Sequence, residues 1–455
     1  MNGRRMLAGG EPGSLVGIWL VGVFGRLTMK VLVLTLGTRG DVQPFVALAR
    51  ELQRRGHQAV VAAPERFADL IGGQGVSFAG VDDGPLRVLD SGSAVGDVAI
   101  GGLWAKAALM RRLPAMFSRV LDDSWRVAST GLGAGADVIV HNGQIMAGQH
   151  VAEKLGVPAV LALPMPMYVP TGQFPWPGQQ FPEWLPAGVN RLTYAGMKAP
   201  AVMFGRTVDR WRAGLGLPRR RGRHDPLRRP DGGPVPVLHA VSPAVLPRPA
   251  DWPATAQVTG YWFVAQPPAT DSVESGLDAL VSAGSDEPLV YIGFGSMAGP
   301  DPVATTQVVV QALRMAGVRG VVAGGWGGLR EVPPPEVFLA GEVPHEVVFP
   351  RMAVIVHHGG AGTTAAAVRA GRPQVVCPFV GDQPFWGRRM RQLGTAPEPI
   401  DQRRLSAPRL AAAIRTAIDD SAMVTAARRL GDQVRSENGA ATAVDVLEQV
   451  SAGHR

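Results

Sequence analysis

The stretch VIVHHGGAGTTAAAVRAGRPQVVCPFVGDQPFWGRRMRQL, from Val354 to Leu393, decides the fold of this chain. Its first three residues form a short apolar run that suits a buried parallel strand. A glycine-rich turn, 357–364, follows, and Thr363 or Thr364 can cap the helix after it. Alanines favour that helix, and Gly371 is typical of its end. Strand, glycine turn and helix in this order predict a parallel α/β sheet.

The chemistry that this stretch favours is the binding of a sugar attached to a diphosphate. A helix N-terminus behind glycines leaves backbone N–H groups free to hold an anion. The next expected strand, 374–379, is followed by Asp382 and Gln383, whose carboxylate and amide can hydrogen-bond sugar hydroxyls. An ordinary strand-to-helix turn has similar spacing, so the spacing alone leaves that alternative open.

The same alternation recurs towards the start of the chain. Short strands are expected at 30–36, 58–63, 137–141 and 159–163, and helices at 42–55 and 148–155. Such a pattern predicts a doubly wound parallel sheet that collects ligands at the carboxyl ends of its strands. The chain has 455 residues, which exceeds the length at which a single hydrophobic core usually divides. Its hydrophobic residues, 46% of the total, suffice for two cores.

Three blocks together resemble one family closely. HHGGAGTT and GDQPFW, in the stretch quoted above, resemble the donor signature of the sterol glucosyltransferase-like and antibiotic glycosyltransferases. VLVLTLGTRGDVQP, 31–44, is similar to the family's first strand and catalytic loop, and LVYIGFGSM, 289–297, to the opening of its C-terminal domain. The resemblance runs from about Met29 to Ile400. It implies the GT-B fold, in which two Rossmann-like domains face each other across a cleft and a C-terminal helix crosses back to the first domain.

The resemblance also implies roles for individual residues. Asp41, at the tip of the loop after the first strand, would be the catalytic base, although on position alone it could be an ordinary helix cap. His358 would bind the diphosphate. The remaining donor-binding residues implied by the family pattern are Ser296, Val343, His345, Gly360, Gly362, Thr363, Asp382 and Gln383. Plant relatives have a tryptophan that stacks on the base where Glu342 stands here, so the backbone near Val343 is expected to recognise the base, and UDP and TDP stay undecided.

The acceptor side departs from the family pattern. Plant-type relatives pair a catalytic histidine with an acidic residue after a later strand, whereas this chain has His141 and Asn142 there. We expect these two residues to contact the acceptor, with a structural histidine as the alternative. Prolines and aromatic residues crowd the segment 164–185, and Tyr168, Phe174 and Trp176 are expected to line an apolar acceptor cleft. Ordinary packing of the loop explains the same composition.

The expected organisation has five parts. Residues 1–28 are a disordered or misassigned extension with Met29 as the natural start, 29–263 an acceptor-binding domain, 264–287 a linker, 288–435 a nucleotide-sugar-binding domain, and 436–455 the C-terminal helix and tail. Residues 15–27 only faintly imitate a signal peptide, and no apolar run reaches the length of a membrane span.

Charge and cysteine content exclude several classes. The net charge is +8, and 206–229 alone holds nine arginines against two aspartates. With one aromatic residue there, Trp211, we expect a solvated loop rather than a nucleic-acid groove, or a weak peripheral contact with an anionic membrane. The single cysteine, Cys377, excludes a disulfide within the chain and is compatible with the cytoplasm.

These observations predict an inverting glycosyltransferase that needs neither cofactor nor metal, because no metal-ligand spacing appears. It would move a hexose, glucose or a deoxysugar, from a UDP- or TDP-sugar to a hydroxyl of a lipophilic polyketide, glycopeptide, sterol-like or glycolipid acceptor in secondary metabolism. One base on the acceptor side implies direct displacement and inversion. The alternatives are a sugar-nucleotide epimerase of the same fold and a non-catalytic nucleotide-sugar-binding helper. The sequence leaves the oligomeric state undetermined.

Overall fold

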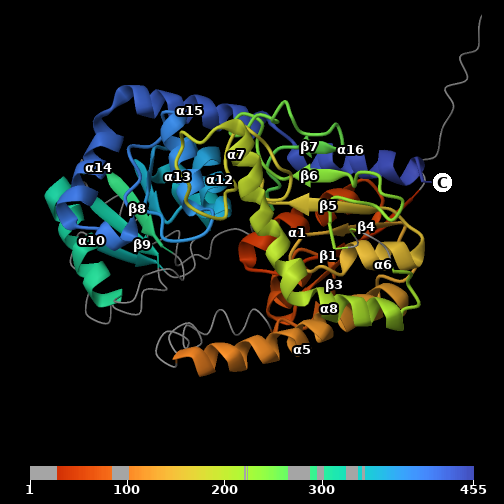
Figure 1. Cartoon of the computed structure of the whole chain (residues 1–455). Helices are drawn as coiled ribbons and strands as arrows, with labels where there is room; N and C mark the ends of the chain where they lie inside the picture. The colour runs from red at the N-terminus through yellow and green to blue at the C-terminus, as the bar shows by residue number, and fades with distance from the viewer. Residues whose placement is uncertain are drawn as a thin grey trace, which may run out of the picture.

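The computed structural model describes residues 28–84, 102–219, 222, 224–264, 287–294, 302–323, 337–340 and 344–454. They form two lobes, each built on a parallel sheet (Figure 1). The structure therefore confirms the expected two-domain α/β class. The proposed extension 1–28 and linker 264–287 lie almost wholly outside the described residues, so these two boundaries stay predictions.

The N-terminal lobe contains a seven-stranded sheet of order β3-β2-β1-β4-β5-β6-β7, with every neighbouring pair parallel. Its strands are β1 (Lys30–Leu34), β2 (Gln58–Pro64), β3 (Ser77–Val81), β4 (Val138–His141), β5 (Ala159–Leu163), β6 (Val237–His239) and β7 (Ala256–Val258). Its helices are α1 (Arg39–Arg54), η1 (Glu65–Phe67), α2 (Ala68–Gly72), α5 (Gly102–Ser129), α6 (Gly148–Leu155), α7 (Ala187–Thr193), η2 (Tyr194–Lys198) and α8 (Ala199–Gly214).

The C-terminal lobe repeats the design with a five-stranded parallel sheet of order β10-β9-β8-β11-β12. Its strands are β8 (Leu289–Gly293), β9 (Arg319–Ala323), β10 (Val337–Ala340), β11 (Val354–His357) and β12 (Gln374–Val376). Its helices are α10 (Pro302–Ala316), α11 (His345–Val348), η3 (Phe349–Arg351), α12 (Ala361–Ala370), α13 (Gln383–Gln392), η4 (Gln402–Arg404), α14 (Ala407–Asp419) and α15 (Ser421–Ser436).

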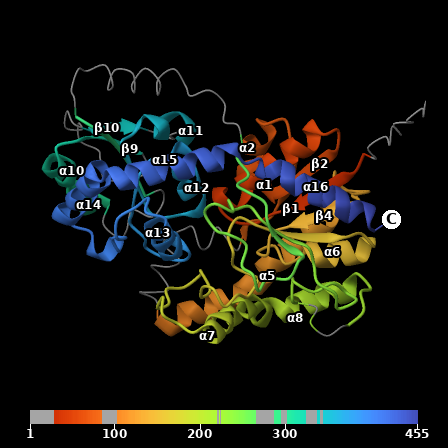
Figure 2. The same ribbon diagram turned by 90° about the horizontal axis from the view of Figure 1, so that it is seen from above.

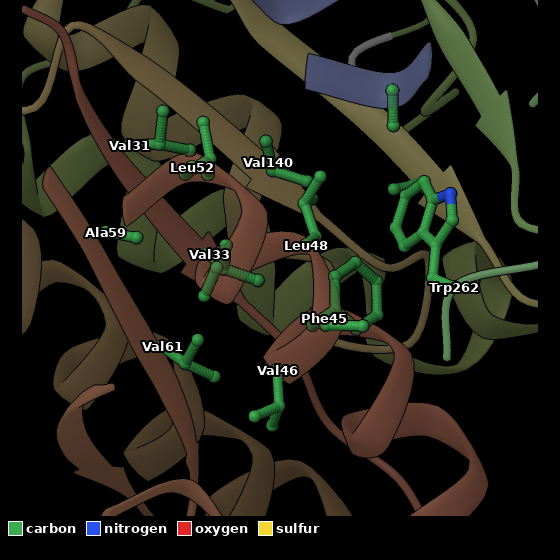
Figure 3. Close-up of a cluster of buried hydrophobic side chains, with 14 of the residues drawn as sticks. Val31, Val33, Phe45, Val46, Leu48, Leu52, Ala59, Val61, Val140 and Trp262 are labelled. Atoms are coloured by element: carbon green, nitrogen blue, oxygen red, sulfur yellow. The ribbon is translucent and has the colours of Figure 1, made fainter. Parts of the chain in front are cut away.

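The last helix, α16 (Gly439–Ala452), returns to the N-terminal lobe, as expected for the fold (Figures 1 and 2). Its apolar face joins the core between β1 and α1, where Phe45 meets Trp262 edge to face at 5.9 Å (Figure 3). Buried apolar area is the main stabilising term of such a core. The C-terminal segment is therefore a structural part of the first lobe.

The arginine-rich stretch 206–229 is not the single solvated loop that its composition predicts. Its first part belongs to α8, and Arg212 is buried, donating to Glu153 Oε2 at 2.7 Å and to the Pro218 carbonyl at 2.8 Å. Because a buried guanidinium needs such partners, Arg212 anchors the helix instead of serving the surface. Residues 220, 221 and 223 lie outside the described residues.

No helix in the described part of the chain is long and apolar enough to cross a membrane. Cys377 is buried, and burial raises the pKa of its thiol to about 12, which agrees with the expected structural role.

Candidate functional site

Asp41 lies at the carboxyl edge of the N-terminal sheet, in the first turn of α1 rather than at the tip of a loop. Thr38 caps this helix, and its backbone N–H and hydroxyl both donate to Asp41 Oδ2, at 2.8 and 3.0 Å. Gln144 Nε2 donates to Oδ1 at 3.1 Å. Burial raises the pKa of Asp41, and these hydrogen bonds oppose the rise. The carboxylate is thus fixed in orientation on both oxygens.

Gln144 reaches Asp41 because the parallel register pairs Leu34 of β1 with His141 of β4, so that the loops after both strands meet. Asn142 ties these loops together: its Nδ2 donates to Thr35 Oγ1 at 3.0 Å and to the Leu36 carbonyl at 2.7 Å. His141 and Asn142 are 1% and 2% exposed. The acceptor contact expected of them is therefore corrected, since neither side chain reaches the surface and both support the loop.

The loop that carries Gln144 is held in a tight turn. Met146 has φ 51°, in the left-handed region that residues other than glycine rarely adopt, and the Ala147 N–H donates to the Ile145 carbonyl at 2.6 Å. Asn142 Oδ1 accepts from the Ile145 N–H at 3.3 Å. Backbone strain of this kind is maintained only where the surroundings fix the conformation, and here it fixes the segment beside the carboxylate.

The aromatic residues of the segment 164–185 divide between two roles. Tyr168 is half-buried near Asp41: burial and the charge of Asp41 both raise the pKa of its phenol. Phe174 packs against Phe385 of the other lobe, with ring centroids 5.3 Å apart. A Cβ added at Gly178 or at Gly196 would meet the ring of Trp176, at 2.4 and 3.1 Å, so Trp176 packs between its own loop and η2. Of the three, Tyr168 is the one that the structure brings to Asp41.

The opposing lobe presents the N-terminus of α12. This helix begins at Ala361, behind Gly360, and neither Thr363 nor Thr364 caps it, because no side chain caps the helix and Thr364 is buried within it. Helix N-termini without caps have backbone N–H groups without intrahelical partners, which suit an anion. Gly371 ends the helix with φ 67°, as the sequence predicts.

Two histidines lie beside this terminus and have different tasks. His357 is structural: the Gly359 N–H donates to its Nδ1 at 3.0 Å, and its Nε2 lies 2.9 Å from Gln374 Oε1. His358 lies against the helix start, since a Cβ added to Gly360 would be 2.5 Å from its Nε2. Burial lowers the pKa of His358, so the ring is neutral at pH 7.

His345, at the start of α11, stacks on Phe349 at 4.2 Å between ring centroids. Burial lowers its pKa to about 4, and the charges of Arg39 and His358 act in the same direction. Arg39 belongs to the N-terminal lobe, so the charge of that lobe acts on His345. The aromatic stacking makes its side chain mainly structural.

Asp382 follows β12 and lies at the N-terminus of α13. Its Oδ2 accepts from Trp386 Nε1 at 2.7 Å. Burial raises the pKa of Asp382 to about 6, and the charge of Asp41 contributes to the rise. Gln383 Oε1 accepts from the N–H groups of Phe379 and Val380, at 2.8 and 3.1 Å, which leaves Nε2 as its group for a ligand.

Asp41 and Tyr168 belong to the N-terminal lobe, and the charge of Asp41 acts on both Tyr168 and Asp382. Within the C-terminal lobe, a Cβ added to Gly359 would lie 3.0 Å from the Gln383 carbonyl, so the start of α12 and the loop that carries Asp382 are neighbours. Gly362 and Thr363 lie in the first turn of α12. Ser296 and Val343 lie outside the described residues. Sequence reasoning missed Thr38 and Gln144; the spacing Thr-x-x-Asp of a capping box was a signal for Thr38, whereas nothing local marks Gln144. Within the described part of the chain, no cluster of three His, Cys, Asp or Glu could hold a metal.

Comparisons with known proteins agree with this geometry. Residues 31–171 match the glycosyltransferase family 28 N-terminal domain, and 321–450 match the erythromycin biosynthesis protein CIII-like C-terminal domain. The O-mycaminosyltylonolide 6-deoxyallosyltransferase of Streptomyces fradiae is 37% identical over 434 residues, covering 92% of this chain and 97% of that protein. The sterol 3-beta-glucosyltransferase of Debaryomyces hansenii is 31% identical over 438 residues, covering 91% of this chain but 26% of that longer protein.

Solved structures share the fold at low sequence identity. Spinosyn forosaminyltransferase SpnP has a TM-score of 0.65 at 19% identity, covering 93% of this chain and 100% of its own. Glycosyltransferase VinC in complex with dTDP has a TM-score of 0.64 at 18% identity, with the same coverage.

Proposed function

Since this chain belongs to the family of antibiotic and sterol glycosyltransferases, we propose that it transfers a hexose, glucose or a deoxysugar, from a UDP- or TDP-sugar to a hydroxyl of a lipophilic small molecule, with inversion. The S. fradiae relative is named as a deoxyallosyltransferase and aligns over 97% of its length, which favours a deoxysugar and a secondary-metabolite acceptor. The observation that carries the proposal is the buried carboxylate of Asp41, held by Thr38 and Gln144, together with the uncapped end of α12 in the other lobe.

The mechanism assigns the proton transfer to Asp41. The acceptor hydroxyl donates its proton to the Asp41 carboxylate while its oxygen attacks the anomeric carbon, and the bond from that carbon to the diphosphate oxygen breaks. Thr38 and Gln144 hold the carboxylate in place during the attack. Because one displacement occurs from the face opposite the leaving group, the configuration at the anomeric carbon inverts.

The leaving diphosphate is stabilised by the start of α12. Backbone N–H groups of Gly362 and Thr363 and the neutral imidazole of His358 offer hydrogen bonds to the developing negative charge. Asp382 and Gln383 Nε2 hold the sugar hydroxyls. We propose that these groups suffice without a metal or a cofactor, so turnover should persist in EDTA.

The central test is Asp41→Asn. The variant keeps the shape of the side chain but cannot accept the proton, so turnover should fall by about 10²–10⁴-fold. The affinity for a nucleoside diphosphate, measured by calorimetry, should stay close to that of the wild type. Unchanged turnover would remove Asp41 from the mechanism.

Two alternatives give different products in the same assay. An epimerase would convert the nucleotide-sugar without an acceptor and would need acid/base groups on both faces of the sugar. A non-catalytic helper would bind the nucleotide and release no diphosphate. Acceptor-dependent release of UDP or TDP, coupled to a glycosylated product, distinguishes transfer from both.

We further propose a weak contact with an anionic membrane, in a cytoplasmic protein, through an apolar-basic patch on α7, η2 and α8. Trp184, Leu192 and Val202 are 79%, 72% and 83% exposed. Lys198 and Arg206 are exposed, stand four residues before and after Val202, and have no carboxylate partner among the described residues. Figure 2 shows α7 and α8 along one side of the lobe. Interfacial apolar residues with unpaired cations suit an anionic lipid surface, from which a lipophilic acceptor could be taken.

Vesicle sedimentation tests this contact. The wild-type protein should bind phosphatidylglycerol vesicles, and Leu192→Ser with Val202→Ser should reduce binding several-fold. Leu132→Ser is the matched control, because Leu132 is 57% exposed and lies outside the patch. Equal binding by all three proteins would contradict the proposed surface.

A further inference from the structure

A surface cavity of about 690 Å³ lies on the C-terminal lobe, at the opposite end of α12 from the candidate donor site. Four arginines line it: Arg369 and Arg372 from the end of α12 and the turn after it, and Arg428 and Arg435 from α15. Glu346 is the single carboxylate among the described residues that line it. Such a concentration of one charge in one cavity is a feature that the proposed transfer reaction does not use.

Two of the four arginines are neutralised by carboxylates. Arg369 pairs with Glu346 at 2.7 Å, and Arg435 pairs with Asp432 at 2.5 Å. Arg372 donates to the Pro350 carbonyl, and neither Arg372 nor Arg428 has a carboxylate partner among the described residues. The cavity therefore contains an excess of two positive charges.

The two unpaired guanidinium groups lie near enough to influence each other. Burial lowers the pKa of Arg372, and the charge of Arg428 lowers it further. Like charges held together cost free energy that an anion between them would recover.

The backbone forces this arrangement. A Cβ added to Gly431 of α15 would lie 2.6 Å from the Cα of Gly371, which itself has φ 67°. This contact between two glycines brings α15 against the end of α12, so the arginines on both elements face one cavity. Arg435 also donates to the Arg369 carbonyl, and Arg369 lies 4.6 Å from the ring centre of Phe263. Arg369 and Arg435 are thus held in place by these contacts.

We propose that this cavity is a binding site for a phosphate-class anion, either inorganic phosphate or the phosphate group of a small phosphorylated molecule. Phosphate carries about two negative charges at neutral pH, which equals the uncompensated charge of the cavity. Guanidinium groups match phosphate oxygens with paired hydrogen bonds, which favours this class over a simple halide. The site is separate from the donor diphosphate site and does not depend on the proposed transfer reaction.

The test measures inorganic phosphate binding by calorimetry at constant ionic strength, with chloride as the competing anion. No nucleotide is added, because a nucleoside diphosphate could itself occupy the cavity. The wild-type protein should bind phosphate, and the part of that binding that depends on the cavity arginines reports this site. Arg372→Gln with Arg428→Gln should weaken that binding at least 10-fold, and Arg428→Gln alone should weaken it in part.

The matched control is Arg391→Gln with Arg415→Gln, which removes the same charge from exposed ion pairs elsewhere on the lobe. This control should bind phosphate like the wild type. Equal weakening in both double variants would reduce the effect to net charge and overturn the proposal, as would the absence of phosphate binding to the wild type. A phosphorylated sugar and free phosphate, compared on the same proteins, distinguish the two sources of the anion.

Discussion

At the scale of single residues, burial raises the pKa of Asp41, and the hydrogen bond from Gln144 is one of those that oppose the rise. Hydrogen bonds to a carboxylate favour its charged form and lower its pKa. Gln144→Met removes the donor but keeps the length of the side chain, so the pKa of Asp41 should rise. The acidic limb of the pH profile of kcat/KM should then move to higher pH.

The control for this shift is Gln53→Met on the same lobe. Gln53 Nε2 also donates a hydrogen bond, at 3.0 Å to the Gly75 carbonyl, but far from Asp41. Its pH profile should coincide with that of the wild type. A Gln144→Met profile that falls in height without moving along the pH axis would assign Gln144 a purely structural role.

Individual site residues differ in how far the sequence could identify them. Asp41, His358 and Asp382 belong to motifs that are continuous in the chain, so a local pattern is enough to propose them. Gln144 is 103 residues from Asp41, and their contact depends on the pairing of β1 with β4. No local pattern contains the order of strands in a sheet, so this residue could not have been found in advance. The acceptor contact expected of Trp176 stays a prediction, because aromatic composition does not tell cleft lining from loop packing.

At the scale of the element, the two glycines at the start of α12 differ in the room that they leave for a side chain. A Cβ on Gly360 would displace the ring of His358, whereas a Cβ on Gly362 meets no protein atom within 4 Å. Gly360→Ala should therefore weaken nucleoside diphosphate binding by about 10-fold, the loss of roughly one hydrogen bond to a charged group. Calorimetry with UDP and TDP measures this effect.

Gly362→Ala is the comparison for the same turn, and it should keep the wild-type affinity with an equal or higher melting temperature, since alanine favours a helix over glycine. If Gly360→Ala also keeps its affinity, His358 does not contribute to the diphosphate site. Alanine can adopt the backbone conformation of both glycines, because Gly360 has φ −62° and Gly362 lies within the helix.

Elements bounded by glycine or proline were predicted well, whereas the start of α12 was not. Strand β5 and helix α6 match their expected bounds, 159–163 and 148–155. Helix α12 begins before the threonines that were expected to cap it, because the turn leaves its first N–H groups unsatisfied. A rule based on stability assigns a cap wherever a threonine is available, whereas here Gly360 precedes the first turn and no side chain caps the helix.

At the scale of the whole molecule, the chain closes the N-terminal lobe with its last helix. Arg55 and His57, next to α1 and β2, contact Asp445 and Glu448 of α16 at 2.5 and 2.9 Å. A Cβ added to Gly439 would meet the backbone of Gly260 at 2.4 Å, so the crossing point requires close contact between two glycines. Because α16 follows the second lobe in the chain, the core of the first lobe is complete only when this last helix is in place. The crossing of the chain also keeps the two lobes next to each other, with Asp41 on one and Asp382 on the other.

This arrangement predicts that Leu447→Ala destabilises a lobe whose sheet ends nearly two hundred residues earlier in the chain. Leu447 is fully buried in the core that contains β1 and α1, and its truncation should lower the free energy of unfolding of that lobe by about 2–5 kcal/mol. Hydrogen exchange should accelerate in peptides of β1 and α1 while β11 and α12 keep their protection, and TDP or UDP binding should persist. Gln449→Ala, on the exposed face of the same helix, should change exchange little. Faster exchange confined to α16 itself would show instead that the helix is an accessory layer, and the lobe would then be complete without it.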